Sequence, residues 1–493
     1  MSTDAERQPL LPKSDHPDDI CKDVRDNVTV IDFHADDPEN PLQWSATFKW
    51  AIVDLLAFMA FTVTFTCISV VPIANRIVRD LSHNDRPNKS ASVLLVTIWE
   101  LGEAAGPLFI GPLSEMFGRR RVLNVATMLF VAFTVLAASC QSTNLFIAAR
   151  LLTGAAVASN VLNPAIVGDI FPPEQRGSAM SMIMIAPMIG GAVGPAMAGA
   201  IANSIGWRQV LWIAAVLALA CEIAFLCYFR ETYKVTILRR RVSKIQHENR
   251  LSSIKTAYDN DQNFERGFWA SIARPFRVFY SSVVLQGLSL FGGMTFTYYY
   301  VMATTLPDVL EGVYGLSPAL TGSCFICFSI GSTIAVLVCN RVLDRIYVRL
   351  RDANKGIDRP EYRLPLAILG AFTLPATIAA YGLVAEKHLP LPVLLVAIGL
   401  IGVSLMLGFL PILSYVVDAL GSYSASGMTA VIVARCLMGT FFPLAATPLT
   451  AKLGYGWGFA VLGAVSLALA PIPILIYKFG HTWRARSAYT SSS

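Results

Sequence analysis

Long apolar runs alternate with short polar segments along most of this chain. A run of about 20 apolar residues spans the hydrocarbon core of a bilayer as a helix, because a helix satisfies its backbone hydrogen bonds internally. The pattern predicts about twelve such helices and hence an all-α polytopic membrane protein. The predicted helices lie at 48–72, 92–112, 121–140, 144–168, 178–203, 208–229, 279–305, 320–340, 364–384, 391–413, 423–446 and 456–478.

The polar segments divide the chain into two halves of six helices each. Residues 230–278 predict a cytoplasmic linker between an N-terminal bundle, 48–229, and a C-terminal bundle, 279–478. Residues 1–47 are rich in Asp, Pro and Ser and lack apolar periodicity, which predicts a disordered cytoplasmic tail. Residues 479–493 form a second cytoplasmic tail.

Charge sets the expected orientation. Hydrophobic residues make up 54% of the chain, too many for a soluble core to hide. Most of the 39 lysines and arginines lie in the two tails and the even-numbered loops, which places both termini in the cytoplasm. The net charge of +6 is therefore a signal of orientation and of lipid headgroups, and no basic domain indicates nucleic-acid binding.

A compact charged segment, Gly111–Arg121, separates the second and third apolar runs. It reads G-P-L-S-E-M-F-G-R-R-R, and an acid beside an arginine cluster cannot lie in hydrocarbon. Gly111 and Gly118 allow close backbone approach in such a hinge. A weaker hinge, Asn340–Arg345, follows the eighth run. Similar hinges at corresponding places indicate a duplicated six-helix unit with pseudo-symmetric halves.

Two further patterns lie within apolar runs. Arg150-Leu-Leu-Thr-Gly154 puts an arginine in the fourth run, where it requires a cavity, a partner acid or a position at the interface. The fifth run reads G-G-A-V-G-P-A-M-A-G from Gly190 through Gly194 and Pro195 to Gly199. Its small residues allow tight helix packing, and the proline removes a helix hydrogen bond so that the segment can bend.

These three patterns resemble the signature motifs of the major facilitator superfamily, and within it the fungal twelve-span drug:proton antiporter group. The hinge is similar to the family's G-x-L-x-D-R/K-x-G-R/K-R/K loop, with Glu115 for the usual aspartate and Met116 for a basic residue. The fourth run is similar to R-x-x-x-G, and the fifth is similar to G-x-x-x-G-P-x-x-G-G. The flanking segment Asp37–Trp44 and the last three runs extend the resemblance over nearly the whole chain.

The resemblance implies antiport, since the family's fifth-run signature is associated with exporters. It also implies a gating role for the hinge, whose acid interacts with its own arginines and with a helix of the other half in the outward-facing state. Asp169, at the end of the fourth run, is a candidate partner for Arg119 or Arg120.

Four charged residues in apolar runs are candidates for proton coupling: Asp54, Glu100, Glu103 and Arg150. Glu100 and Glu103 are three residues apart and share one helix face. Hydrocarbon favours the neutral form of a carboxylate, so such a group can take up a proton near physiological pH. Arg150 or Arg435 can instead hold one of these acids in a structural ion pair, and the sequence leaves both alternatives open.

Three consecutive tyrosines in the seventh run are candidates for the substrate cavity. Tyr298, Tyr299 and Tyr300 offer stacking surfaces with hydroxyl tips, which suit planar organic molecules. Successive helix residues point about 100° apart, so at most two of the three can face one cavity. We expect Arg435 to line the same cavity from the eleventh run.

We therefore expect a proton-coupled exporter of organic small molecules, such as drugs, fungicides or toxic metabolites, with two bundles that rock about a midplane site. A proton symporter that imports a nutrient and a non-transporting sensor on the same scaffold are the alternatives. An enzyme is disfavoured, because the sequence has no nucleophile elbow and no phosphate-binding glycine loop. The expected partners are a small organic substrate, protons and the lipid bilayer, with no nucleic acid, cofactor or metal, and we expect a monomer.

The plasma membrane is the expected location. The vacuolar membrane is the alternative, because Glu6–Leu11 resembles an acidic dileucine sorting signal. Asn88-Lys89-Ser90 is a possible glycosylation sequon in the first outer loop. Cys324 and Cys327 form a C-x-x-C without a second ligand pair nearby, which does not indicate a metal site.

Overall fold

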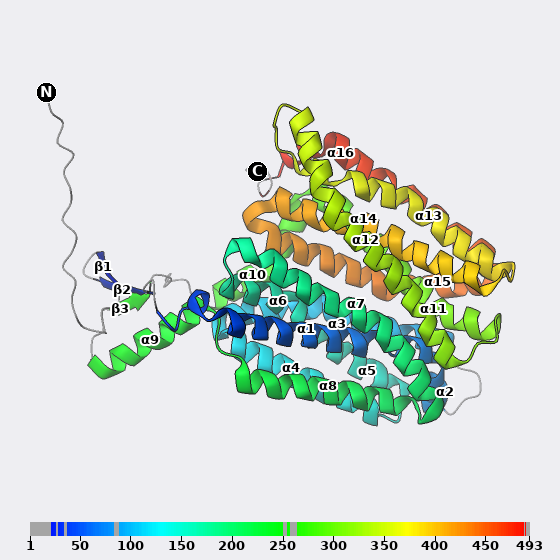
Figure 1. Cartoon of the computed structure of the whole chain (residues 1–493), viewed down its shortest axis with the longest axis horizontal. Coiled ribbons are helices and arrows are strands. Elements are labelled where there is room, and N and C mark those ends of the chain that lie inside the picture. Colours follow the sequence, from blue (N-terminus) through cyan, green and yellow to red (C-terminus); the bar gives the residue numbers. More distant parts are fainter. Residues whose placement is uncertain are drawn as a thin grey trace.

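The computed structural model describes residues 21–25, 28–33, 37–82, 88–249, 254–256, 264–487 and 489. Its long helices run side by side in two groups, the first half in the lower part of Figure 1 and the second half in the upper part. The first half comprises η1 (Pro41–Gln43), α1 (Ala46–Ile68), η2 (Val71–Ile73), α2 (Ala74–Ser82), α3 (Lys89–Phe117), α4 (Arg119–Ser139), α5 (Thr143–Ala155), α6 (Ser159–Ile170), α7 (Pro173–Ser204) and α8 (Trp207–Tyr228). The second half comprises α11 (Val283–Gly312), α12 (Pro318–Ala353), η3 (Pro360–Arg363), α13 (Pro365–Glu386), α14 (Leu391–Leu420), η4 (Gly421–Tyr423), α15 (Ser424–Leu469) and α16 (Pro471–Arg484). The expected helical membrane fold is confirmed.

Each of the twelve expected ranges falls on helical structure. Within the described residues, 10 helical segments are long and apolar enough to cross a bilayer, and α11, bent by 97° against the helix before it, gives an eleventh. The segment Ser424–Arg484 has 61 residues, or about 90 Å of helix, which is enough for two crossings. It breaks at Gly454, whose φ of 76° is not helical and which therefore separates the last two spans.

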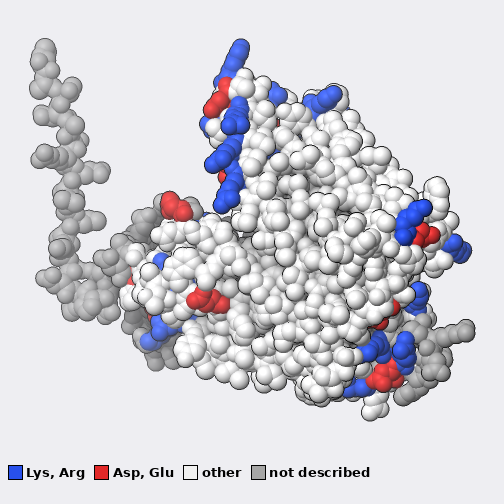
Figure 2. All heavy atoms as spheres, turned by 45° about the vertical axis from the view of Figure 1, so that its right-hand side comes forward, with Lys and Arg blue, Asp and Glu red and all other residues white. Residues whose placement is uncertain are grey.

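Charged side chains gather at the two ends of the helices, with a broad belt almost free of charge between them (Figure 2). We call these the α9 end, where the linker lies, and the α2 end, where residues 140–142, 205–206 and 313–317 connect helices. The belt carries exposed apolar side chains, including Val125, Met128 and Val216. Such a belt fits the hydrocarbon layer of a membrane.

The tail and the linker contain regular structure that their composition did not predict. The linker holds α9 (Lys234–Asn249), β3 (Ile254–Thr256) and α10 (Phe264–Ser281), and the tail holds β1 (Cys21–Arg25) and β2 (Val28–Asp32). The β1 strand pairs antiparallel with β2, and β2 pairs parallel with β3. The sheet thus joins segments more than 200 residues apart, a pairing that local composition cannot reveal. The sorting-signal candidate Glu6–Leu11 lies outside the described residues.

A salt-bridge cluster fastens the tail to α9. The Arg241 guanidinium lies 2.6 Å from Asp37 Oδ2 and 2.6 Å from Glu39 Oε2. Its hydrogen bonds to Asp37, more than those to Glu39, raise the pKa of Arg241, although partial burial opposes them. The segment that leads into α1 is therefore tied to the linker helix.

The C-terminal boundary also differs from the expectation. The last helix, α16, continues to Arg484, whose guanidinium Nε lies 2.9 Å from Glu361 Oε1. Both side chains are buried, and a buried ion pair needs both partners in place. Residues 479–484 therefore belong to the packed C-terminal bundle rather than to a free tail.

Candidate functional site

Two glutamates from one half and two residues from the other meet in the centre of the molecule. Glu100 and Glu103 lie one turn apart on α3 and are 1% and 8% exposed. Tyr300 of α11 donates a hydrogen bond of 2.5 Å to Glu100 Oε1. Arg435 of α15 lies 2.8 Å from Glu103 Oε1. The four side chains, which we call the central cluster, link the two bundles.

The two carboxylates of the central cluster have different surroundings. Glu103 accepts hydrogen bonds from Trp99 Nε1 at 3.2 Å, from Asn160 Nδ2 at 2.8 Å and from Arg435 Nη2. Glu100 accepts one hydrogen bond from Tyr300, and its Oε2 has no hydrogen-bond partner among the described residues. Donors stabilise an ionised carboxylate, whereas burial without donors favours the protonated form. Glu103 therefore has three donors beside its charge, whereas Glu100 has one donor and one oxygen without a partner among the described residues.

Arg435 lies between the two acids and is held by the second half. Its guanidinium stacks over the Phe296 ring at 4.4 Å and is 3.8 Å from Glu100 Oε2. Its nearest acid is Glu103, so Arg435 forms the ion pair that the sequence left open. A change of charge on Glu100 therefore changes its electrostatic interaction with the Arg435 guanidinium.

Arg150 lies inside the first bundle and makes no ion pair with the glutamates. It is 1% exposed, stacks over Trp99 at 4.5 Å and donates hydrogen bonds of 2.9 Å to the carbonyls of Thr66 and Cys67. These carbonyls belong to the last turn of α1, where a positive charge is favourable. Arg150 therefore fastens α5 to the end of α1, and a position at the interface is excluded.

Asp54 lies apart from the central cluster. Its side chain is on an exposed stretch of α1 with Trp50 and Phe58, and it has no hydrogen bond or ion pair in the described part of the chain. The structure therefore brings together Glu100 and Glu103 of the three candidate acids and leaves Asp54 outside.

The central cluster also contains a thiol. Glu100, Glu103 and Cys436 place one ligand atom each within 4.8 Å of one another, a spacing that could suit a metal ion. The Arg435 guanidinium already lies against both glutamates, and its positive charge repels a second cation. The arrangement therefore favours an ion pair over a metal site.

The three consecutive tyrosines point to three different places. Tyr300 reaches Glu100, Tyr299 packs its ring 4.8 Å from that of Phe328, and Tyr298 donates to the Leu462 carbonyl within the second half. All three are buried. Contact of any of them with substrate stays a prediction.

The hinge between α3 and α4 is held by Asp169 of the first half and by Glu231 of the linker. Arg119 Nε lies 3.2 Å from Asp169 Oδ2, which is the expected contact, and Glu231 accepts hydrogen bonds from the backbone N–H groups of Arg119 and Arg120. The N-cap residue of α4 is Gly118, with a φ of 93°, which has no side chain that could accept a hydrogen bond. The carboxylate of Glu231 takes over this capping role. Glu115 is exposed and pairs with no described residue of the other half. The gating role of the hinge stays a prediction.

The second half repeats this arrangement. Arg363, two residues before α13, lies 2.8 Å from Asp418 Oδ2 and also pairs with Asp344. Asp344 belongs to Asn340–Arg345, which was expected to be a hinge but lies inside the continuous helix α12. Burial lowers the pKa of Arg363, but its hydrogen bonds to Asp418 and Asp344 outweigh burial and raise it. Arg119 and Asp169 occupy the corresponding places in the first half. The repeated ion pair supports a duplicated unit.

The small residues of the fifth run pack α7 between the two halves. Gly190 faces the Phe61 carbonyl of α1, where an added Cβ would lie 2.9 Å from the oxygen, and Gly194 faces Phe65. Gly199 meets the Pro318 carbonyl of α12, and Gly322 of α12 meets the Pro195 carbonyl. The contacts of Gly190, Gly199 and Gly322 leave no room for a side chain, and Gly199 lies five residues before the end of α7.

We expect a Gly199→Val substitution to abolish transport, because its side chain would push α7 and α12 apart at the α2 end. The rate of substrate movement in proteoliposomes measures this effect. Gly177→Val on the same helix is the matched control, since an added Cβ there meets nothing within 4 Å. An unchanged rate in Gly199→Val would show that transport does not need this close approach.

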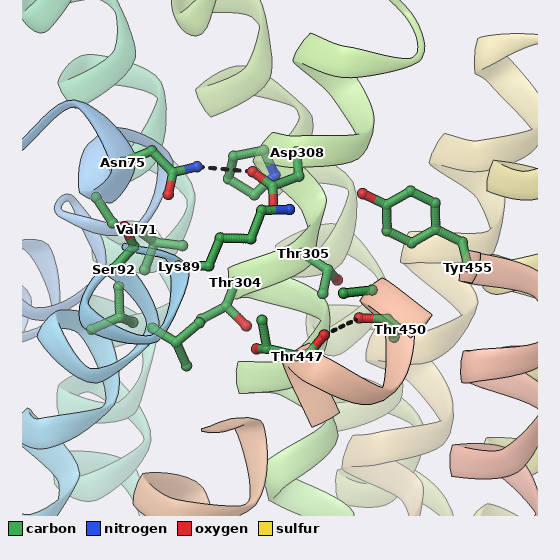
Figure 3. A pocket seen from close by; sticks show the side chains of 15 residues that line it. Val71, Asn75, Lys89, Ser92, Thr304, Thr305, Asp308, Thr447, Thr450 and Tyr455 are labelled. Carbon is green, nitrogen blue, oxygen red and sulfur yellow. Dashed lines mark hydrogen bonds and ion pairs between the residues drawn. The ribbon is translucent and has the colours of Figure 1, made fainter. Parts of the chain in front are cut away.

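A small polar pocket at the α2 end is closed by contacts between the halves (Figure 3). Asn75 Nδ2 donates to Asp308 Oδ1 at 2.8 Å, and Lys89 Nζ lies 3.5 Å from Asp308 Oδ2. The pocket has a volume of about 50 Å³, room for water but not for an organic substrate. Asn88 beside it caps α3 with its side-chain oxygen, and glycosylation there stays a prediction.

Three functional candidates were missed by sequence reasoning: Asn160, Glu231 and Asp308. Each had a faint signal, because a polar residue within or beside an apolar run needs a partner. Their partners, Glu103, the α4 N-terminus and the pair Asn75 and Lys89, lie on other helices. Only the fold brings these groups together.

Comparison with known proteins identifies the kind of chain. The model of the Major Facilitator Superfamily matches residues 53–443. The MFS transporter cpaT of Aspergillus oryzae is 32% identical over 457 residues, which cover 92% of each chain. Efflux pump radE of Floropilus chiversii is 31% identical over 471 residues, which cover 95% of this chain and 87% of that one.

Solved structures share the fold. A D-xylose–proton symporter superposes with a TM-score of 0.63 at 19% identity, covering 88% of this chain and 98% of the other. The human organic anion transporter MFSD10 (TETRAN) gives a TM-score of 0.61 at 17% identity, covering 87% and 100%. At these identities the likeness concerns the fold and not the cargo.

Proposed function

Because this chain belongs to the major facilitator superfamily, we propose that it is a proton-coupled exporter of organic small molecules that works by alternating access. It is a multi-pass membrane transporter rather than an enzyme. In the proposal, the bundles 48–229 and 279–484 rock about the central cluster, and the linker 230–278 joins them on the cytoplasmic side.

The observation that carries the proposal is the link between Glu100 and the other half. Tyr300 and Arg435 both belong to the second half, and both contact or approach Glu100. A proton on Glu100 removes the charge that attracts Arg435, so it changes the free energy of the contact between bundles. Glu103, with its three donors, keeps Arg435 in place throughout.

The proposed cycle follows from this difference between the two glutamates. Glu100 takes a proton when the α2 end is open to the outside, and its neutral form favours the inward-facing state. Substrate then enters from the α9 end, and its binding near Tyr299 and Tyr300 displaces the proton into the cytoplasm. The closed contacts of Asp308 with Asn75 and Lys89 suit an inward-facing or occluded state.

Export is supported by two observations. The small-residue signature of α7 packs between the halves, and one relative at 31% identity is named an efflux pump.

The excess of lysine and arginine at the α9 end supports cytoplasmic termini. We include in the proposal a monomer in the plasma membrane, with drugs, fungicides or toxic metabolites as cargo.

Transport in proteoliposomes tests this function. The purified protein is reconstituted with an internal pH dye, and a panel of cationic, neutral and anionic organic molecules is added on one side. When a proton gradient is imposed, we expect at least one compound to cross the membrane in the direction opposite to the proton flow. Proton and substrate flow in the same direction would indicate a symporter, and no flow for a broad panel would count against proton-coupled transport.

A further inference from the structure

A basic groove lies between α9 and the corner where α3 meets α4. It has a volume of about 570 Å³ and is open on one side. Its lining residues are Met116, Phe117, Arg121, Thr236, Arg239, Arg240, Ser243 and Lys244. Four of the eight are cations and two carry hydroxyl groups. The groove therefore offers positive charge, N–H donors and two hydroxyl groups that can donate hydrogen bonds, which suits an anion.

The α9 face of the groove is built into the helix. Its five lining residues follow the spacing i, i+3, i+4, i+7, i+8 from Thr236 to Lys244, which places them on one side of the helix. The remaining sides are fixed by packing, because Leu238 and Val242 are buried and Arg241 is clamped by acids of the tail. The groove is therefore a formed feature and not a chance approach of mobile side chains.

Three of the four cations of the groove have no acidic partner among the described residues. Arg121, Arg240 and Lys244 are exposed, and no carboxylate of the described chain pairs with them. Glu115, the acid nearest to the groove along α3, does not line it. Like charges gathered in one groove repel one another, so a bound anion relieves the repulsion.

The position of the groove identifies the source of that anion. Met116 and Phe117 end a membrane-crossing helix, and Phe117 is 44% exposed. An apolar rim beside a cationic groove at the end of a span corresponds to the boundary between acyl chains and headgroups. We propose that this groove binds the phosphate headgroup of an anionic phospholipid, with the acyl chains along Met116 and Phe117. The bound lipid anchors α9, and through Arg241 the tail, to the membrane surface.

Binding of short-chain lipids to the purified full chain tests the proposal. The affinity for dioctanoyl phosphatidic acid is measured in neutral detergent, with dioctanoyl phosphatidylcholine as the neutral lipid and glycerol 3-phosphate as the soluble phosphate. We expect saturable binding of phosphatidic acid that weakens about twenty-five-fold in the double variant Arg240→Gln/Lys244→Gln, since each cation contributes about fivefold. Both substitutions are on the exposed side of α9, so folding should be unaffected.

The double variant Arg345→Gln/Arg349→Gln is the matched control. Both arginines are exposed, four residues apart on α12 and at the same end of the molecule, but outside the groove. Equal weakening in this control would show a nonspecific charge effect and overturn the site. Absence of saturable phosphatidic acid binding would do the same. Equally tight binding of glycerol 3-phosphate would overturn the lipid as ligand and assign the groove to a soluble phosphate.

Discussion

Replacing Glu100 by glutamine should reduce substrate-driven proton flux in proteoliposomes to the level of protein-free vesicles. The side-chain amide cannot take up a proton, whereas its oxygen can still accept the hydrogen bond from Tyr300. The variant should therefore fold and bind substrate, and substrate–substrate exchange without a pH gradient should persist. The measurement compares proton flux and exchange in the same preparation.

Two further variants separate the acids. Asp54→Asn is the matched control and should keep its proton coupling, because Asp54 lies outside the central cluster. Glu103→Gln should disturb the ion pair with Arg435 and lower stability as well as transport. Normal coupling in Glu100→Gln would reject Glu100 as the proton carrier, and loss of coupling in Asp54→Asn alone would transfer that role to Asp54.

Replacing Arg435 by glutamine should destabilise the protein by about 3–5 kcal/mol, because it leaves two buried carboxylates without their cation. The loss is expected to appear as a lower midpoint of thermal unfolding in detergent. Transport should also fail, since Arg435 is the only cation that links the glutamates to the second half within the described structure.

The double variant Arg435→Gln/Glu103→Gln separates stability from coupling. Removing both members of the pair takes away the unpaired charge, so much of the lost stability should return while transport stays absent. Arg435→Lys keeps the charge but loses the planar guanidinium that stacks on Phe296. Its midpoint of thermal unfolding should therefore lie between that of the unsubstituted protein and that of Arg435→Gln. A midpoint unchanged in Arg435→Gln would contradict a structural role for this ion pair.

The sequence determined the fold class, the span pattern and the family resemblance. Hydrocarbon admits only segments that satisfy their own backbone, so runs of about 20 apolar residues specify helices without any tertiary contact. The turn within Gly111–Arg121 could also be predicted from the sequence, because a tight turn between two spans needs a glycine at a position of positive φ, such as Gly118. The sequence also narrowed the coupling candidates to a few acids in apolar runs.

Only the tertiary structure chose among those candidates. Glu103 meets an arginine 332 positions away and Glu100 meets a tyrosine 200 positions away, while Asp54 meets neither. The pairing of the tail with Ile254–Thr256 and the basic groove beside α9 depend on contacts of the same kind. Helix formation is decided by neighbours within one turn, but the partner of a buried charge is decided by how whole helices pack. A single sequence therefore predicts the helices directly, but only the folded structure shows which residues pair with the buried charges.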